Sequence, residues 1–235
     1  APTPTETATL VAEHIDRWRQ AELAAHRIVG VGLAVPGLVR TGDGLVRDAP
    51  HLGWRDVPLA ELIRDATGVP TAIGNDASLG VLAEHLFGAA RGTADVVYLN
   101  GGASGIGGGL IVAGNPLAGT GGYAGEFGQN RPGIEDAADR RVPGGVLEDE
   151  VNRSLLLAAL GLTDADDAQL TNAVAAASGD ARAEIERQQR ILATALANAV
   201  NVLNPSVVVL GGFLAALCAS DLGALGDAGR AQAMP

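Results

Sequence analysis

A chain of 235 residues is long enough to bury a large hydrophobic core, either as one domain or as two smaller lobes. Hydrophobic residues make up 47% of the sequence and aromatic residues only 3%, so the core must be built of Ala, Val and Leu. The net charge of −11 argues against this segment binding nucleic acid by itself. The absence of lysine excludes the P-loop signature, whose glycine-rich loop ends in Gly-Lys-Ser/Thr.

Cysteine usage and hydropathy indicate a cytoplasmic protein without a membrane span. The single cysteine, Cys218, allows neither an internal disulfide nor a cysteine-rich zinc site, and it fits a reducing compartment. The longest apolar run, Val207 to Ala219, is too short to cross a bilayer, and the N-terminus has no secretory signal pattern. The only methionine is Met234, and we expect the sequence to be part of a longer chain.

The first third of the chain alternates strands and helices. Apolar residues at helical spacing predict a first helix from an N-cap at Thr5 to about His26. Strands are predicted at 28–35 and 69–73, helices at 57–67 and 77–87, a hairpin turn at 41–44 and a loop at 49–54. This alternation predicts an α/β sheet.

A glycine-rich stretch occupies the middle of the chain. A strand is predicted at 96–99, followed by a loop that carries Gly101, Gly102, Gly105, Gly107, Gly108 and Gly109. An apolar run at 110–113 and a second turn at 114–116 follow. Such glycines serve positive φ angles or close backbone approach, for example an anion resting on N–H groups. A tight hairpin explains them equally well.

Helices dominate the last third. An irregular loop is predicted at 130–145, helices at 147–160, 166–177, 181–203 and 213–219, and a buried strand at 207–210. Asn204-Pro205 ends the long helix.

Asn75-Asp76 lies where a predicted strand ends and a helix begins. Ligands of open α/β sheets bind at such strand ends, although an aspartate there also serves as a simple helix cap. The standard catalytic motifs are absent. Leu110 stands where G-x-G-x-x-G requires glycine, no G-x-S-x-G surrounds Ser104, and the histidines form no H-E-x-x-H.

An ordered set of motifs resembles the ROK family, named for repressors, open reading frames and sugar kinases. The resemblance covers Ile28 to the C-terminus. Its motifs are Val-Gly-Leu-Ala-Val-Pro-Gly-Leu-Val at 31–39, Asp-Ala-Pro-His-Leu-Gly-Trp at 48–54, Asn75-Asp76-Ala77 with Glu84, Gly-Ile-Gly-Gly-Gly at 105–109, Gly-Glu-Phe-Gly at 125–128, and Asn204-Pro205 with Val-Val-Leu-Gly-Gly at 208–212.

The resemblance implies an actin/hexokinase-like fold of ribonuclease-H type, with two α/β lobes and a central sugar-binding cleft. It places the N-terminal lobe at 1–74 and the C-terminal lobe at 75–235. The Asp-x-Gly-x-Thr phosphate loop that opens the family's kinases is absent. We therefore expect the first strands to lie upstream of Ala1, with a closing strand and helix downstream of Pro235. Without those first strands, the N-terminal sheet would have two strands and a bare edge.

The resemblance also implies a site. Asn75, Asp76, Glu126 and Glu148 would hold sugar hydroxyls, with Gly37 and Gln129 beside them, and Asp76 would be the catalytic base if the protein is a kinase. Carboxylates and amides suit vicinal hydroxyls, and a base must reach the hydroxyl proton directly. A degenerate nucleotide site would comprise Gly105, Gly107 and Gly108 in the phosphate loop and Gly211 and Gly212 in the adenosine loop.

The chain departs from the family at the zinc site. The family's histidine ligand is replaced by Gln129, and its three cysteines by Asp139, Arg141 and Val146. We expect no structural zinc and no cofactor, with ATP and magnesium needed only by a kinase. Without zinc, the loop at 130–145 must be held by other contacts or be mobile. The placement of Glu148 depends on which of these two alternatives holds.

Three functions remain open. The missing zinc ligands and the Phe-Leu-Ala-Ala-Leu ending at 213–217 favour the sugar-sensing domain of a transcriptional regulator, with a helix-turn-helix domain upstream. An ATP-dependent hexose kinase and a sugar-binding protein with neither activity are the alternatives, so enzyme activity is left undecided. The implied partners are a sugar or sugar phosphate, DNA through the upstream domain, and further copies of the chain in a dimer or tetramer.

Overall fold

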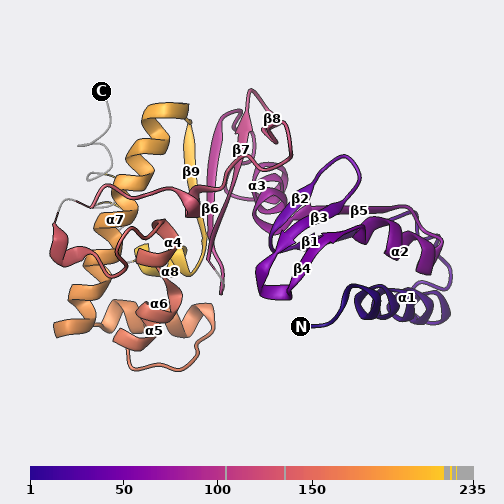
Figure 1. Ribbon diagram of the computed structural model, residues 1–235, viewed down its shortest axis with the longest axis horizontal. Helices are drawn as coiled ribbons and strands as arrows, with labels where there is room; N and C mark the ends of the chain where they lie inside the picture. Colours follow the sequence, from indigo (N-terminus) through magenta and orange to yellow (C-terminus); the bar gives the residue numbers. More distant parts are fainter. Residues whose placement is uncertain (104, 135, 220–222, 224–225, 227–235) are drawn as a thin grey trace. The chain divides into compact units, whose positions relative to one another are not determined.

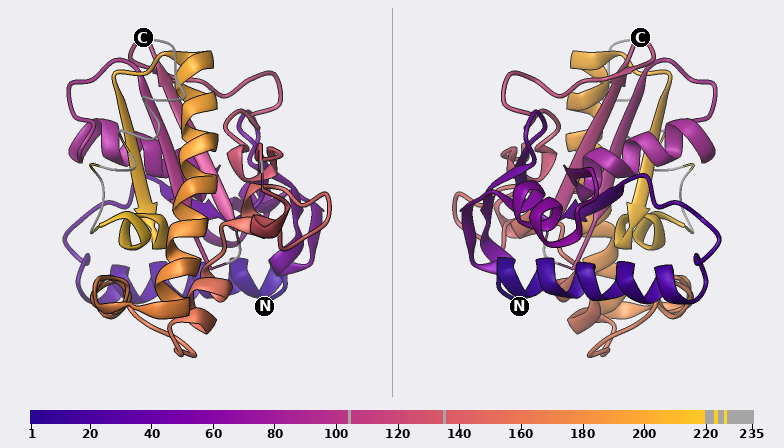
Figure 2. Two further views of the ribbon diagram at one scale, coloured as in Figure 1. Left: turned by 90° about the vertical axis from the view of Figure 1, so that its left-hand side faces the viewer. Right: turned by 90° about the vertical axis from the view of Figure 1, so that its right-hand side faces the viewer.

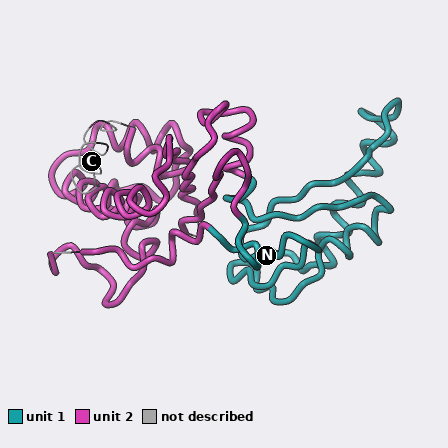
Figure 3. Tube along the Cα trace, turned by 90° about the horizontal axis from the view of Figure 1, so that it is seen from above, with its two compact units in different colours: residues 1–79, 118–124 teal, residues 80–117, 125–235 magenta. Residues whose placement is uncertain are grey.

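The chain forms two compact units in a computed structural model that describes residues 1–103, 105–134 and 136–219, together with Gly223 and Gly226. The first unit comprises residues 1–79 and 118–124, and the second comprises 80–117 and 125–235 (Figure 3). Helix α3 (Asp76–Phe87) continues across the change of unit, so the predicted division after residue 74 stays a prediction. Ser104 and the tail from Ala231 to Pro235 lie outside the described residues.

Helices and strands alternate along the first half of the chain, and helices dominate the second (Figure 1). The strands are β1 (Val31–Val35), β2 (Leu38–Arg40), β3 (Leu45–Ala49), β4 (Trp54–Val57), β5 (Thr71–Asn75), β6 (Val96–Gly101), β7 (Ile106–Val112), β8 (Asn115–Pro116) and β9 (Val207–Gly212). The other helices are α1 (Pro4–Gln20), α2 (Leu59–Thr67), α4 (Leu147–Glu150), α5 (Arg153–Ala159), α6 (Asp167–Ala176), α7 (Gly179–Leu203) and α8 (Phe213–Cys218). Across the described ranges, no helix is both long and apolar enough to cross a bilayer.

The first unit contains two small sheets. Strands β1 and β5 pair in parallel, with Val35 opposite Asn75, and β2, β3 and β4 form an antiparallel sheet. The predicted hairpin turn joins β2 to β3, and Gly68 ends α2 in the left-handed conformation. Buried Val46, Leu59 and Ile63 anchor the core of this unit.

Helix α1 begins and ends earlier than the sequence predicts. Its N-cap is Thr3 and not Thr5, because Thr3 and Glu6 form a capping box and Pro4 occupies the first helical position. It ends at Gln20, where the prediction extended it to about His26.

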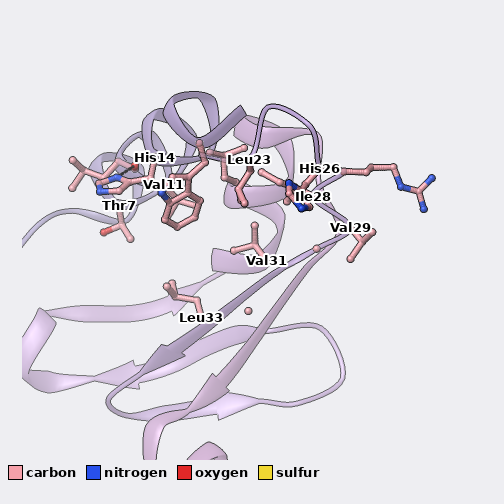
Figure 4. A pocket seen from close by; sticks show the side chains of 15 residues that line it. Thr7, Val11, His14, Leu23, His26, Ile28, Val29, Val31 and Leu33 are labelled. Carbon is pink, nitrogen blue, oxygen red and sulfur yellow. Dashed lines mark hydrogen bonds between the residues drawn. The ribbon is translucent and has the colours of Figure 1, made fainter. Parts of the chain in front are cut away.

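An apolar cavity of about 670 Å³ lies between α1 and β1 in the first unit. Figure 4 shows Val11 and Leu23 on one side of it and Val31 and Leu33 on the other. Strand β1 pairs with β5 alone among the described strands, so the sheet has the two strands and the open edge that the sequence analysis expected.

The second unit is built on the sheet β8-β7-β6-β9, with helices on both faces. Strand β6 pairs antiparallel with β7 and parallel with β9. Its side chains alternate between two cores: Val96 and Tyr98 pack with Val81 of α3, whereas Val97 and Leu99 pack with the helices from α4 onward. Figure 2 shows α7 along one face of this sheet. Burial on both faces explains the continuous apolar run of β6.

The central glycines are mostly strand residues, which corrects the predicted loop. Gly107, Gly108 and Gly109 lie within β7, and the pairing of β6 with β7 ends at Gly101 opposite Ile106. The tight-hairpin interpretation is therefore correct for this stretch. A Cβ on Gly108 would meet the carbonyl of Gly125 and the ring of Phe127, so the close approach at β7 is that of the chain itself.

The helix predicted at 147–160 is broken in two. Helix α4 ends at Glu150, and α5 begins at Arg153. Asn152 causes the break because its side-chain oxygen accepts from the N–H groups of Ser154 and Leu155 as an N-cap. The loop at 130–145 is irregular as predicted over its described residues, apart from a 3-10 turn at Ala137–Asp139.

Candidate functional site

The predicted site residues of the first unit meet where β5 joins α3. The amide Nδ2 of Asn75 donates to the carbonyl of Gly37 at 2.9 Å, and its Oδ1 accepts from the N–H of Ser78 at 2.9 Å. Asn75 thus caps α3 and holds the turn that follows β1. Asp76 is exposed, and its Oδ1 accepts from the N–H of Ala77 at 2.9 Å. The helix-capping role proposed for Asp76 therefore belongs to Asn75, whose side chain accepts from the third residue of α3, whereas Asp76 bonds only the adjacent N–H.

Gly37 has a backbone conformation that other residues rarely adopt. Its φ is +126°, and a Cβ there would lie 2.8 Å from the Cα of Ala49, and against the carbonyl of Asp48. The turn therefore approaches β3 as closely as a glycine permits.

In the second unit, Glu148 and Gln129 form a hydrogen-bonded pair. The amide Nε2 of Gln129 donates to Oε1 of Glu148 at 2.6 Å, and the backbone N–H of Ile106 donates to Oε2 at 3.1 Å. Glu148 is half-buried on α4, and Gln129 is exposed at the end of a 3-10 turn over Phe127–Gln129. Residues from β7, the 3-10 turn and α4 thus converge on one carboxylate.

Two glycines make room for this carboxylate. A Cβ on Gly105 or on Gly128 would meet Oε2 of Glu148, and Gly105 has a φ of +153°. Glu126 lies on the surface at the start of the same 3-10 turn, where its carbonyl accepts from the N–H of Gln129 at 3.2 Å. The predicted sugar-contacting residues of this unit are therefore clustered.

The predicted nucleotide residues lie at one end of the second sheet. Gly211 pairs with Asn100 and Gly212 with Gly101, next to the hairpin that carries Gly105. Gly212 has a φ of +59° and precedes α8. Gly107 and Gly108 lie inside β7 and Gly211 and Gly212 end β9, so the two predicted loops are brought together, but of these five glycines only Gly105 lies outside a strand. Their role in binding nucleotide stays a prediction.

The second unit also contains a buried charged cluster that was not predicted from the sequence. Glu150 is fully buried, Arg187 is 2% exposed and Gln188 is fully buried. A signal was present, because Gln188 falls between Ile185 and Leu192 on the apolar stripe of α7.

Glu184, which lies one turn before Gln188 on α7, joins the cluster through hydrogen bonds from Arg187 and Gln188. Burial alone would raise the pKa of Glu184, but hydrogen bonds from Arg187 and Gln188 outweigh it and lower the pKa below 4.5. Burial likewise opposes the charge of Arg187, whose pKa is nevertheless raised by Glu184 and Glu150. Within the described part of the chain, no group of three or more His, Cys, Asp or Glu side chains is placed to hold a metal ion.

Comparison with known proteins defines the class to which this fold and these motifs belong. A profile of the ROK family matches residues 1–218. The glucokinase of Halalkalibacterium halodurans is 29% identical over 227 residues, which cover 87% of this chain and 67% of that protein. A putative xylose repressor of a Caldicellulosiruptor species is 30% identical over 206 residues, which cover 78% of this chain and 50% of the repressor.

Solved structures give the same result. A ROK-family transcriptional regulator, described as a homologue of the E. coli MLC protein, has a TM-score of 0.81 and 24% identity, covering 97% of this chain and 61% of that one. The ROK hexokinase of Thermus thermophilus has a TM-score of 0.73 and 28% identity, covering 99% of this chain and 79% of that one.

The chain belongs to the ROK family and has its actin/hexokinase-like sugar kinase fold. Its relatives include both repressors and glucokinases at nearly equal identity. It spans half the length of the two Caldicellulosiruptor xylose repressors that it matches.

Proposed function

We propose that this chain is the sugar-sensing effector part of a ROK-family transcriptional regulator of carbohydrate metabolism. The observation that carries the sugar-binding part is the convergence of amide and carboxylate groups at Glu148 and Gln129. Paired donors and acceptors of this kind suit vicinal hydroxyls, which both donate and accept. The xylose repressors among the relatives support the regulatory part.

The sugar-contacting residues in this proposal are Asn75 and Asp76 of the first unit and Glu126, Gln129 and Glu148 of the second. The DNA-binding module is a helix-turn-helix domain outside this chain. Sugar binding shifts the population of effector conformations and so changes the affinity of that module for DNA. By linkage, DNA binding changes the affinity for sugar by the same factor.

Isothermal titration with a panel that includes xylose and glucose tests the sugar site. We expect at least one sugar to bind, and Asp76→Ala to weaken it about tenfold or more, which corresponds to about 1.4 kcal/mol. Asp65→Ala is the matched control, because Asp65 is an exposed residue of α2 away from the β5–α3 junction. Unchanged affinity in Asp76→Ala would overturn the assignment of Asp76.

An ATP-dependent hexose kinase is the second candidate. It is favoured by Asp76, which lies exposed at the end of β5, and by the glucokinase relative. In the full-length protein, this activity would use Asp76 as the base that takes the proton of the sugar hydroxyl. Coupled ADP release from Mg-ATP and a hexose panel separates the two functions. Turnover of about 1–1000 s⁻¹ would establish the kinase and overturn the regulator.

A further inference from the structure

The four positions at which the family resemblance implies zinc ligands do not form a zinc donor set in this chain. Zinc takes thiolate, imidazole or carboxylate ligands, usually four of them. Val146 has no donor atom and Arg141 is a cation. Asp139 already pairs with Arg190, whose Nη2 lies 3.0 Å from its Oδ1. Gln129 is bonded to Glu148. Something else must fix the loop that carries these residues.

That loop is bonded instead to Arg187 of the long helix α7. Nε and Nη2 donate to the carboxylate of Glu184 at 2.9 and 2.7 Å. Nη1 donates to the carbonyl of Asp139 at 2.7 Å and to the carboxylate of Glu150 at 3.1 Å, and Nη2 also donates to the carbonyl of Glu150 at 2.7 Å. A guanidinium has five N–H groups, and these contacts use all of them.

Glu150 in turn accepts hydrogen bonds from the backbone of the loop. Its Oε1 accepts from the N–H groups of Arg141 and Val142 at 3.1 and 3.0 Å, and its Oε2 accepts from Arg141 at 3.0 Å. Glu150 is 0% and Arg187 is 2% exposed, so this ion pair is buried and its groups are compensated by hydrogen bonds.

The same cluster supports the helix that carries Glu148. Glu148 and Glu150 both belong to the single turn of α4. Asn152 donates to the carbonyl of Glu148 at 3.1 Å, and its own N–H donates to Gln188 at 3.1 Å. Gln188 in turn donates to Glu184 at 3.0 Å. The C-terminal end of α4 is thus tied to α7 through Glu150 and Asn152.

We propose that Arg187, paired with Glu150 and Glu184, takes the place of the family's zinc and is the positioning residue for Glu148. It holds the described parts of the loop at 130–145 without a metal ion, and it keeps the Glu148 carboxylate on the N–H of Ile106 and the amide of Gln129. The role of this arrangement in sugar binding rests on the proposed function. The positioning of Glu148 by Arg187 does not depend on it.

Arg187→Lys tests the proposal because lysine keeps the positive charge but loses the planar fork that reaches three residues at once. Residue-resolved amide hydrogen exchange is measured by NMR in the unliganded protein. We expect exchange at Arg141, Val142 and Ile106 to accelerate about tenfold or more while strand β6 stays protected. The matched control is Arg153→Lys, since Arg153 also bonds a carboxylate and a carbonyl, those of Asp164 and Ala165. It should leave the three amides unchanged.

Unchanged exchange at Arg141 and Val142 in Arg187→Lys would overturn the proposal, and so would faster exchange there with Ile106 unaffected. If Arg187→Lys does not fold, hydrogen exchange at the same three amides is measured in Glu184→Gln instead, with the same expected and contradicting results. Zinc added at equimolar concentration and EDTA should both leave wild-type exchange unchanged, and zinc-dependent protection would overturn the proposal.

Sugar titration of the same variants separates the two proposals. If wild type binds sugar, Arg187→Lys should weaken it about tenfold, and unchanged affinity would overturn the link to Glu148. If wild type binds no sugar, the proposed function fails, and the exchange data still decide the role of Arg187.

Discussion

At the scale of single residues, the predicted site residues are held by backbone groups as well as by each other. Asn75 bonds the carbonyl of Gly37 and the N–H of Ser78, and Glu148 bonds the N–H of Ile106. Such contacts fix the side-chain rotamers before any ligand binds, which lowers the entropy lost on binding. The roles of these residues in sugar binding stay predictions until affinities are measured.

Replacing Gly37 by alanine should destabilise the first unit. The new Cβ would meet the carbonyl of Asp48 and the Cα of Ala49, and alanine is strained at a φ of +126°. We expect a loss of about 1–3 kcal/mol of unfolding free energy, measured by urea denaturation. Gly42→Ala is the control, because a Cβ at Gly42 meets nothing within 4 Å. Equal stability of the two variants would contradict the strain assigned to Gly37.

At the scale of elements, local capping decided where helices begin and end. Thr3 and Glu6 start α1, Gly68 ends α2, and Asn152 interrupts what the apolar pattern predicted as one helix. The apolar pattern reports the buried face of a helix, whereas its ends depend on hydrogen bonds to the first and last turns.

Asn152→Ala should weaken the start of α5. It removes the bonds to the N–H groups of Ser154 and Leu155 and the bond to the carbonyl of Glu148. We expect a loss of about 1–2 kcal/mol, measured by thermal or urea unfolding of the variant. Asn172→Ala serves as the control, since Asn172 is exposed inside α6, where alanine is the better helix former. A variant as stable as this control would contradict the capping role.

At the scale of the whole molecule, one charged cluster joins α7, α4 and the loop before α4 in the second unit. Within it, Glu184 contributes to the acid stability of that unit. The pKa of Glu184 is lowered below 4.5 in the folded state, so the stabilisation is complete above about pH 4.5 and is lost as the pH falls through the lowered pKa.

We therefore expect the melting temperature of wild type to fall faster than that of Glu184→Gln as the pH is lowered below 4.5. The difference between the two should be largest near pH 7. Melting curves at intervals between pH 3 and 7 provide the measurement. Parallel pH profiles would show that Glu184 does not contribute to acid unfolding.

The sequence by itself determined the fold class and the family. The strand–helix alternation, the apolar run of β6 and the ordered glycine and Asn-Asp motifs predicted an α/β fold of the ROK family, and the structure and the family match confirm this. These features are local, because periodicity and short motifs are carried by neighbouring residues.

Only the tertiary structure decided how the site is supported. Gly105 and Gly128 leave room for the carboxylate of Glu148, and Arg187 reaches Asp139 and Glu150 across 48 and 37 positions of sequence. A buried ion pair forms when distant segments fold together and exclude water from charges that satisfy one another. No local pattern distinguishes such an arginine from one on the surface, so Arg187 became visible only in the folded chain.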